Sequence, residues 1–344
     1  MTYSYPSTVN PTVFRTYDIR GPVNPDHINP ELAYYIGLAF GSMAQEANET
    51  TVITGRDGRL TGEAIQAALN AGLRDSGVNV LDIGLVASPI LYYATHERPF
   101  RSGIMVTASH NPAPDNGFKL VLAGKTLTSE GVQVIYQRIV AKQFHRGSGS
   151  IDHDDRVVAD YINTITQKIN LPRRLKVVLD CGNGVGAVAS PQILTQLGCE
   201  VIELFTDIDG RFPNHHPDPT IPANLTDLIA AVQSHQADIG LALDGDADRL
   251  GVVTNSGQII WPDRQLLLFA LDMLTRHPGA DIVFDVKCSN LLPQLIHAHG
   301  GNPIMNQTGP SLIKAKMKAC NAPLAGEMSG HLFFNDVWYG FDDG

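Results

Sequence analysis

The sequence predicts an α/β protein of three serial domains, each with a mixed sheet, helices on both faces and a topology similar to the others. Three observations predict this class. The chain has 344 residues, enough for roughly two or three domains of about 100–150 residues. Short apolar, β-rich runs alternate with amphipathic stretches, as in layered α/β proteins. The alternation occurs in three successive units, without a fixed-period sequence repeat.

The first predicted domain covers residues 1–152 and ends within the polar, Gly/Ser-rich segment 145–155. Its first helix opens with a Thr-Gly-Glu start and closes near Gly77. The predicted elements are strands at residues 51–55, 79–83 and 103–107 and helices at residues 61–75 and 129–142.

The second and third predicted domains cover residues 153–256 and 257–344. Residues 206–222 of the second contain four prolines, which predicts a surface loop without regular structure. The second domain's elements are strands at 176–179, 200–204 and 238–243 and helices at 191–197 and 224–233. The third domain's elements are strands at 282–286 and 302–306 and helices at 290–299 and 311–319.

Composition excludes some classes of function. The formal net charge of −10 argues against a nucleic-acid surface, which needs basic patches. A few converging Arg and Lys residues can still bind an anionic small molecule. The four cysteines show no CxxC spacing, which suits a reducing compartment. There is no signal-peptide pattern and no apolar run near the ~20 residues of a membrane span. The expected location is therefore the cytoplasm.

A candidate nucleophile follows the predicted strand 103–107. Ser109 lies in the motif TASHNP (107–112), at a carboxyl strand end, where open α/β sheets bind ligands. His110 and Lys119 are close enough in sequence to assist proton transfer or charge stabilisation. A GxSxG elbow is absent at this serine, which disfavours a serine esterase. An ordinary turn is the alternative, because Ser, Asn and Pro are turn formers.

A candidate metal site follows the apolar run IGLAL. Asp244, Asp246 and Asp248 alternate in the motif DGDADR, and hard cations prefer such oxygen ligands. An EF-hand is excluded, because Arg249 stands at its sixth position, which requires Gly, and Asn255 at its twelfth, which requires Glu. A solvated acidic turn is the alternative.

A third candidate motif is GEMSGH (326–331), in which Glu327, Ser329 and His331 alternate. On an extended segment they face one side, and their carboxylate, hydroxyl and imidazole suit the hydroxyls of a sugar. An ordinary exposed loop is the alternative.

The motif CGNGVGA (181–187) follows the strand KVVLD and fits the GxGxxA dinucleotide fingerprint, with Glu200 or Glu203 about 20 residues on. It supports an alternative function as an NAD-dependent oxidoreductase. Its glycines equally suit a tight strand-to-helix turn, and the fingerprint leaves the three aspartates unexplained.

Five motifs taken in order resemble the α-D-phosphohexomutase family, most closely its bacterial phosphomannomutase/phosphoglucomutase branch. They span nearly the whole chain: FRTYDIRG (14–21), GRDGR (55–59), TASHNP, DGDADR and GEMSGH. Met328 distinguishes the last from phosphoglucosamine mutases, which usually carry Gln there. The resemblance implies an isomerase that moves phosphate between C1 and C6 of mannose or glucose phosphates. It further implies a phosphoserine, Mg²⁺, a hexose 1,6-bisphosphate intermediate, a small phosphosugar as partner, and a monomer or dimer.

The resemblance also implies residue roles. Ser109 would be the phosphoserine, and Asp244, Asp246 and Asp248 would hold Mg²⁺ together with a phosphoserine oxygen. The domains would then serve phosphoserine chemistry, metal binding and sugar binding in turn. The remaining implied site residues are Arg20, Lys119 and Arg249 around the phosphate, His110 for proton transfer, Glu327 and Ser329 for sugar hydroxyls, and Tyr17, Lys287 and His331 nearby.

The charges agree with that reading. A phosphoserine carries about −1.5 to −2, so with three aspartates the site totals about −5. Mg²⁺ and the three basic residues Arg20, Lys119 and Arg249 supply about +5. Near neutrality requires all of them, which favours phosphoryl transfer over a bare metal loop.

Two departures from the family pattern are present. Family members continue after GFDDG into a fourth, phosphate-anchoring domain, whereas this chain ends at Gly344. We therefore expect the chain to lack that domain and the third to be incomplete. Pro310 stands where relatives commonly carry His, which affects sugar contacts from the third domain. A catalytically silent phosphosugar-binding fragment is a further alternative.

Overall fold

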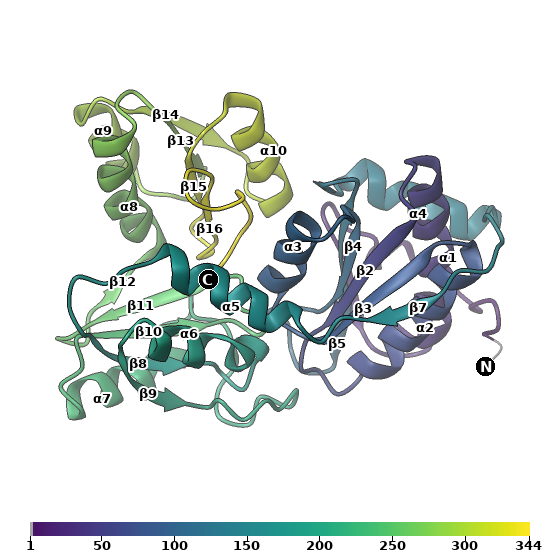
Figure 1. Cartoon of the computed structure of the whole chain (residues 1–344), viewed down its shortest axis with the longest axis horizontal. Helices are drawn as coiled ribbons and strands as arrows, with labels where there is room; N and C mark the ends of the chain where they lie inside the picture. The colour runs from purple at the N-terminus through teal and green to yellow at the C-terminus, as the bar shows by residue number, and fades with distance from the viewer. Residues whose placement is uncertain (1–2) are drawn as a thin grey trace. The chain divides into compact units, whose positions relative to one another are not determined.

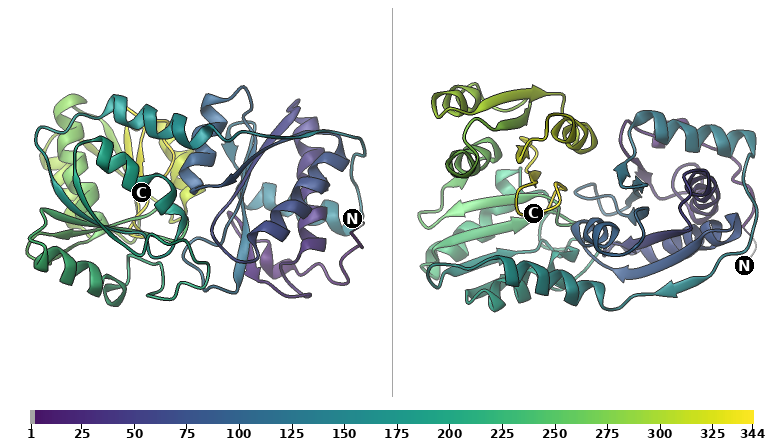
Figure 2. Two further views of the ribbon diagram at one scale, coloured as in Figure 1. Left: turned by 60° about the horizontal axis from the view of Figure 1, so that its bottom comes forward. Right: turned by 45° about the horizontal axis from the view of Figure 1, so that its top comes forward.

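The computed structural model describes residues 3–344, and the chain divides into two compact units. The first comprises the chain up to Asn163 together with Ile208–Pro213, and the second comprises Thr164–Asp207 and Asn214–Gly344. Both units have strands and helices in layers (Figures 1 and 2). The division after Asn163 falls inside α5 (Val157–Lys168).

The first unit is built on one mixed sheet. The strands are β1 (Ile19–Pro22), β2 (Thr51–Arg56), β3 (Asn79–Leu85), β4 (Gly103–Val106), β5 (Asp115–Leu122), β6 (Lys125–Thr126) and β7 (Ile151–His153). Besides α5, the helices are η1 (Pro11–Val13), α1 (Pro30–Glu46), α2 (Gly62–Ser76), α3 (Ser88–Glu97) and α4 (Ser129–Ala141). Among the described residues this is a seven-stranded sheet of order β1-β5-β4-β2-β3-β7, with β6 paired to β5. Helices cover both faces, with α3 on one side and α1 and α2 on the other (Figure 1).

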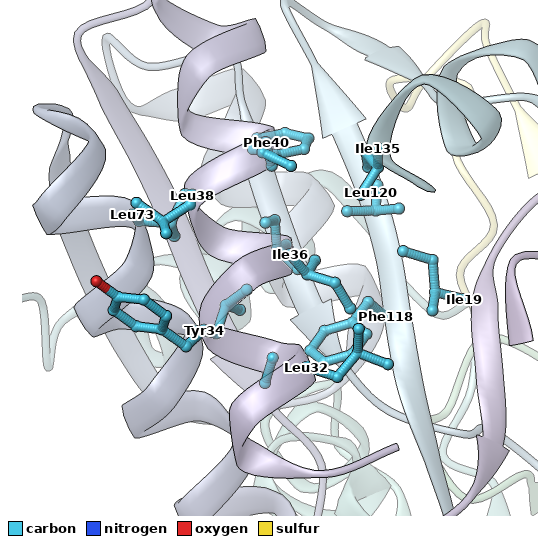
Figure 3. Packing of buried hydrophobic residues seen from close by; sticks show 14 of the residues in the cluster. Ile19, Leu32, Tyr34, Ile36, Leu38, Phe40, Leu73, Phe118, Leu120 and Ile135 are labelled. Carbon is cyan, nitrogen blue, oxygen red and sulfur yellow. The ribbon is translucent and has the colours of Figure 1, made fainter. Parts of the chain in front are cut away.

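Helix α1 supplies many of the buried residues of this unit, although no helix is predicted there from the sequence. Its apolar residues are nearly continuous (LAYYIGLAF) and show no clear amphipathic period, because two of its faces are buried. Figure 3 shows Ile36 and Phe40 on the side of α1 that faces the sheet, whereas Leu38 lies beside Leu73 of α2 and Tyr34 is on the same side of α1 as Leu38. The start is capped: the Asn29 side chain accepts a hydrogen bond of 2.8 Å from Leu32 N, and proline follows at the first helical position.

The second unit holds two sheets. Its strands are β8 (Lys176–Asp180), β9 (Glu200–Leu204), β10 (Ile239–Leu243), β11 (Leu250–Thr254), β12 (Ile259–Ile260), β13 (Asp281–Asp285), β14 (Asn302–Asn306), β15 (Leu324–Gly326) and β16 (Leu332–Phe334). Its helices after α5 are η2 (Val185–Val188), α6 (Ser190–Gln196), η3 (Pro222–Leu225), α7 (Thr226–Ser234), α8 (Pro262–Arg276), α9 (Leu291–Ala298) and α10 (Pro310–Cys320). Within the described chain, the sheet orders are β12-β11-β10-β8-β9 and β14-β13-β15-β16.

The three sheets share one four-stranded topology. In β3-β2-β4-β5, in β9-β8-β10-β11 and in β14-β13-β15-β16, three parallel strands are followed by one antiparallel strand. The predicted fold class, serial mixed-sheet domains of similar topology, is thereby confirmed. The equivalence also gives each sheet a matching loop between its third parallel strand and its antiparallel strand, which matters for the site.

Most predicted elements are confirmed. Each predicted strand and helix has a counterpart whose ends differ by at most two residues. The predicted loop 206–222 has no helix or strand before η3, but it is not only surface, because Gly210 and the run Pro217–Asp218–Pro219 are buried. Across residues 3–344, no helix combines the length and apolar character needed to cross a membrane.

Candidate active site

Ser109 lies in the loop between β4 and β5, where the sequence predicted a ligand-binding loop. Its side chain is buried and its backbone has φ of 50°, in the left-handed region that non-glycine residues seldom adopt. Its N–H donates to Thr107 Oγ1 at 2.8 Å, and that hydroxyl donates to Asp57 Oδ2 at 2.7 Å. The loop therefore holds the serine in a strained conformation, a feature common at functional sites.

The guanidinium of Arg59 holds the same loop through hydrogen bonds to its backbone. Arg59 is 2% exposed, and its Nε lies 3.2 Å from Asp57 Oδ2. It donates hydrogen bonds of 2.6–2.8 Å to four backbone carbonyls, those of Ser109, Asn111, Pro112 and Asp115. In the sequence, GRDGR is recognisable only as a family motif, because nothing in a one-dimensional pattern indicates that its second arginine binds a loop 50 residues away.

Two predicted phosphate ligands flank this loop. Arg20 Nη1 donates to Ala108 O and to Asn111 Oδ1, each at 3.1 Å, and Asp18 pairs with Arg20 at 2.7 Å. Arg20 on β1 is opposite Gly117 of β5, two residues before Lys119, so Arg20 and Lys119 project from the same face of the sheet. Lys119 therefore lies on the same face of the sheet as Arg20, the residue that contacts the Ser109 loop.

The other two predicted residues of this unit are His110 and Tyr17. His110 Nδ1 lies 3.2 Å from Ser109 Oγ, within reach for a proton transfer. Tyr17 is half-buried and precedes β1 by two residues.

Asp244, Asp246 and Asp248 occupy the equivalent loop of the second sheet, between β10 and β11. All three are fully buried, and their carboxylates offer oxygens that lie within 4.8 Å of one another. The loop curls at Ala247, whose φ is 60°, and the backbone N–H groups of Asp248 and Arg249 donate to Asp244 Oδ1 at 3.1 and 3.2 Å. The three carboxylates therefore converge in this loop.

This donor set fits a divalent cation. Three buried ionised carboxylates repel one another and are stable only with compensating positive charge. Arg249, with Nε 3.7 Å from Asp244 Oδ2, supplies one such charge. A hard, oxygen-preferring cation at this cluster is chemically suited to supply the rest.

The glycines of CGNGVGA support this acidic loop. A Cβ at Gly184 would lie 2.8 Å from Gly245 O, and one at Gly186 would lie 2.6 Å from Leu243 Cδ1. Val185 N also donates to Gly245 O at 3.2 Å. The glycines are therefore explained by close packing of two loops, and the dinucleotide interpretation is not supported.

The motif GEMSGH occupies the matching loop of the third sheet, between β15 and β16. The expectation of an extended segment is wrong, because Gly330 N donates to Glu327 O and the loop is a tight turn with Gly330 at φ of 95°. The turn nevertheless gathers the three predicted side chains. Ser329 Oγ lies 2.8 Å from His331 Nδ1, and Glu327 Oε2 lies 3.4 Å from the same nitrogen.

Glu327 is the most enclosed of these side chains, at 1% exposed. Its Oε1 accepts a 2.6 Å hydrogen bond from Gly309 N. Burial raises the pKa of its carboxyl above the ordinary value, although the nearby His331 opposes the rise. Pro310, which stands next to Gly309, is the first residue of α10, a position that suits proline.

Sequence reasoning missed a contact between two of the motifs. His331 Nε2 lies 3.3 Å from Asp248 Oδ1 and 3.7 Å from Asp342 Oδ2, and Lys314 pairs with Asp342 at 2.9 Å. Asp342 belongs to the segment YGFDDG. The two adjacent aspartates of this segment were the feature of the sequence that could have indicated a role for Asp342. Of the remaining predicted residues, Lys287 is exposed and lies two residues after β13.

Models of one protein family match all three parts of the chain. They are the alpha/beta/alpha domains I, II and III of phosphoglucomutase/phosphomannomutase, matched at residues 11–146, 159–257 and 261–344.

Individual relatives are similar over nearly the whole chain. A phosphomannomutase/phosphoglucomutase of Pseudomonas syringae is 53% identical over 98% of this chain and 73% of the relative. A phosphoglucomutase of Neisseria meningitidis is 49% identical over 96% of this chain and 72% of the relative. A crystal structure of a phosphoglucomutase/phosphomannomutase family protein from Burkholderia thailandensis has a TM-score of 0.95 at 49% identity, covering 98% of this chain and 75% of that one.

Proposed function

Because the chain belongs to the phosphoglucomutase/phosphomannomutase family and is accordingly a phosphohexose mutase, we propose that it works through a phosphoserine at Ser109. Neither an NAD-dependent oxidoreductase nor a silent binding fragment is supported by these relatives. The names of the relatives include both sugars, and we propose glucose and mannose phosphates as substrates.

The observation that carries the proposal is the enforced position of Ser109. Its left-handed backbone is held by Thr107 and by the Arg59 hydrogen bonds to the loop carbonyls. Strain that is maintained by so many contacts is characteristic of a site where placement matters for chemistry. Phosphoryl transfer depends chiefly on such positioning and on charge neutralisation.

The proposed cycle assigns a role to each nearby group. Phosphorylated Ser109 transfers its phosphoryl group to the free hydroxyl of a sugar monophosphate: the bond from Ser109 Oγ to phosphorus breaks as the bond from the sugar oxygen forms. His110, whose Nδ1 lies 3.2 Å from Ser109 Oγ, passes the hydroxyl proton to that Oγ. The resulting hexose 1,6-bisphosphate reorients and returns its other phosphate to Ser109. Arg20 and Lys119 bind phosphoryl oxygens, and Arg249 does so beside the acidic cluster.

Asp244, Asp246 and Asp248, with an oxygen of phosphorylated Ser109, would hold Mg²⁺, which supplies positive charge at the transferring phosphate. Glu327 and Ser329 would bind sugar hydroxyls, and Tyr17, Lys287 and His331 would complete the sugar site. We assign these roles to the first, second and third predicted domains, residues 1–152, 153–256 and 257–344.

The test is intact-mass and phosphopeptide analysis after incubation with glucose 1,6-bisphosphate and Mg²⁺. We expect one phosphate on the peptide that contains Ser109 and none in Ser109→Ala. Phosphate at another residue, or equal labelling of the variant, would reject Ser109 as the carrier.

A further inference from the structure

One segment of the predicted loop 206–222 packs on the GRDGR motif, whose Arg59 binds the Ser109 loop. Residues Ile208–Pro213 belong to the first compact unit, although the chain on either side belongs to the second. We call Ile208–Pro213 the 208–213 segment. Its contacts are not used in the proposed cycle.

The 208–213 segment lies directly against GRDGR. Gly210 is buried, and a Cβ there would be 2.6 Å from Arg59 Cα and 2.6 Å from Gly58 O, so only glycine permits this backbone approach. The Phe212 ring faces the Arg59 guanidinium, with 5.2 Å between the guanidinium carbon and the ring centroid, a cation–π arrangement. Hydrogen bonds within the segment join Phe212 N to Asp209 O at 2.9 Å and Arg211 N to Asp209 Oδ1 at 3.0 Å.

Arg59 connects this segment to Ser109. The same guanidinium that faces Phe212 donates to Ser109 O at 2.8 Å and to Asn111 O at 2.6 Å. A planar guanidinium has a fixed fork of donors, so rotating or displacing it disturbs every carbonyl it serves. The position of Phe212 therefore bears on the position of the Ser109 backbone.

The residues on either side of the segment are held by Asn183, which lies in the GNG turn and has no role in the proposed cycle. The Asn183 N–H donates to Phe205 O at 2.8 Å and its side-chain amide donates to Asp207 O at 2.8 Å. Its Oδ1 accepts a 2.8 Å hydrogen bond from Asn214. Asn183 is 4% exposed and has φ of 58°, which asparagine tolerates better than most residues.

We propose that the 208–213 segment is a positioning element for the catalytic serine that acts through Arg59, and that Asn183 supports it by holding the residues that flank it, Asp207 and Asn214. The proposal rests on the assignment of Ser109 as the phosphate carrier. Phe212, Gly210 and Asn183 are positioning residues, since they bear on Ser109 through Arg59 and have no proposed contact with substrate or phosphate. Small displacements of a nucleophile lower the rate of the chemical step steeply.

Two variants test this proposal without disturbing the backbone. Phe212 has φ of 50°, so Phe212→Asn removes the ring while keeping a residue that tolerates the left-handed region, and Asn183→Gly removes the amide at φ of 58°. Asn48→Gly is the matched control, because Asn48 is exposed and also has φ of 58°.

The first readout is amide hydrogen exchange of the peptide covering residues 107–116, which does not depend on activity. We expect exchange there to be at least about 10-fold faster in both variants and unchanged in the control, since exchange reports local opening. Wild-type exchange in Phe212→Asn would overturn the proposal. Wild-type exchange in Asn183→Gly alone would overturn the role of Asn183.

The second readout is the rate of Ser109 phosphorylation at saturating glucose 1,6-bisphosphate. We expect a fall of roughly 10-fold in the variants with little change in the half-saturating concentration, because positioning affects the chemical step more than binding. An unchanged rate alongside faster exchange would reduce the segment to a stabilising element and overturn its positioning role. Absence of phosphate on Ser109 in the wild-type protein would reject the proposed function, while the exchange result would still report on the segment.

Discussion

His331 Nε2 lies 3.3 Å from Asp248 Oδ1, which joins the loop between β15 and β16 to the acidic loop between β10 and β11. A backbone hydrogen bond of 3.1 Å from Leu250 N to Gly330 O runs beside this contact. A residue predicted for the sugar site is therefore also the neighbour of a predicted metal ligand. These two contacts fix the two loops relative to each other.

We predict that His331→Gln weakens metal binding itself. Groups that contact a metal ligand orient it, and their loss typically costs about 10–100-fold in metal affinity. Mn²⁺ titration of the sugar-free protein by calorimetry would measure this. Lys287→Ala is the control, because Lys287 is exposed and has only a proposed sugar role; equal affinities for all three proteins would contradict the prediction.

Asp246→Asn is predicted to lose both metal affinity and mutase turnover. Asp246 is fully buried within the cluster of three carboxylates, and the amide keeps its shape while removing one charge that the cation neutralises. The measurement is turnover across a Mg²⁺ titration. A variant that stays fully active in excess chelator would exclude Asp246 as a ligand.

Substitution of Ser109 by alanine and by glycine is predicted to abolish turnover equally, because both remove the nucleophile. Their stabilities are predicted to differ. Ser109 has φ of 50°, and glycine adopts this region without the roughly 1–2 kcal/mol that a Cβ costs there. Urea unfolding should therefore place Ser109→Gly about 1 kcal/mol above Ser109→Ala. Equal stabilities would argue that the loop relaxes from its left-handed conformation.

The strands and catalytic loops could be predicted because their signals are local. An apolar run such as IGLAL followed by alternating aspartates occupies one short stretch of sequence. Helix α1 could not be predicted, because it is buried on two faces and therefore lacks the polar stripe that marks an amphipathic helix.

Contacts between distant segments could not be predicted in the same way. Arg59 binds carbonyls beyond residue 108, and His331 approaches Asp248 across 83 positions of sequence. Within its own motif, neither Arg59 nor His331 shows a sequence feature that indicates its distant partner. The turn at 327–331 does not follow from the sequence, because alternation of polar residues carries no information about the left-handed conformation of Gly330.

Gly72→Ala is predicted to destabilise the first unit by up to about 2 kcal/mol, because the usual cost of overpacking is about 1–3 kcal/mol. A Cβ on Gly72 of α2 would overlap Tyr34 O of α1, and the backbone there has no flexible end that can move aside. This clash opposes the gain of about 1 kcal/mol in helix propensity. Gly62→Ala, in the same helix, is the control, since its Cβ would be in ordinary contact, 3.5 Å from Asp57 O. Equal unfolding free energies for the two variants would contradict the close approach of α1 and α2.

His215 is predicted to make stability depend on pH. Burial, the largest single influence, lowers the pKa of its imidazole, but it is outweighed by the hydrogen bond to Asp180, with Nε2 3.0 Å from Oδ2, together with the hydrogen bond to His216 O and the charges of Asp180 and Asp227, and the pKa is raised. The folded protein therefore holds this proton more tightly than the unfolded chain, whose histidine pKa is about 6.5. The stabilisation is fully present below about pH 6.5 and is lost as the pH rises through the folded pKa.

The measurement compares the free energy of unfolding of the wild type and His215→Gln in urea at about pH 6 and about pH 9. The gap between them should be larger at the lower pH, because the charged imidazole that pairs with Asp180 is lost as the pH rises through its folded pKa. His235→Gln, at an exposed histidine after α7, controls for the general effect of removing a histidine. A gap that stays constant or widens toward pH 9 would mean that the His215–Asp180 contact stabilises the protein as a neutral hydrogen bond and not as an ion pair.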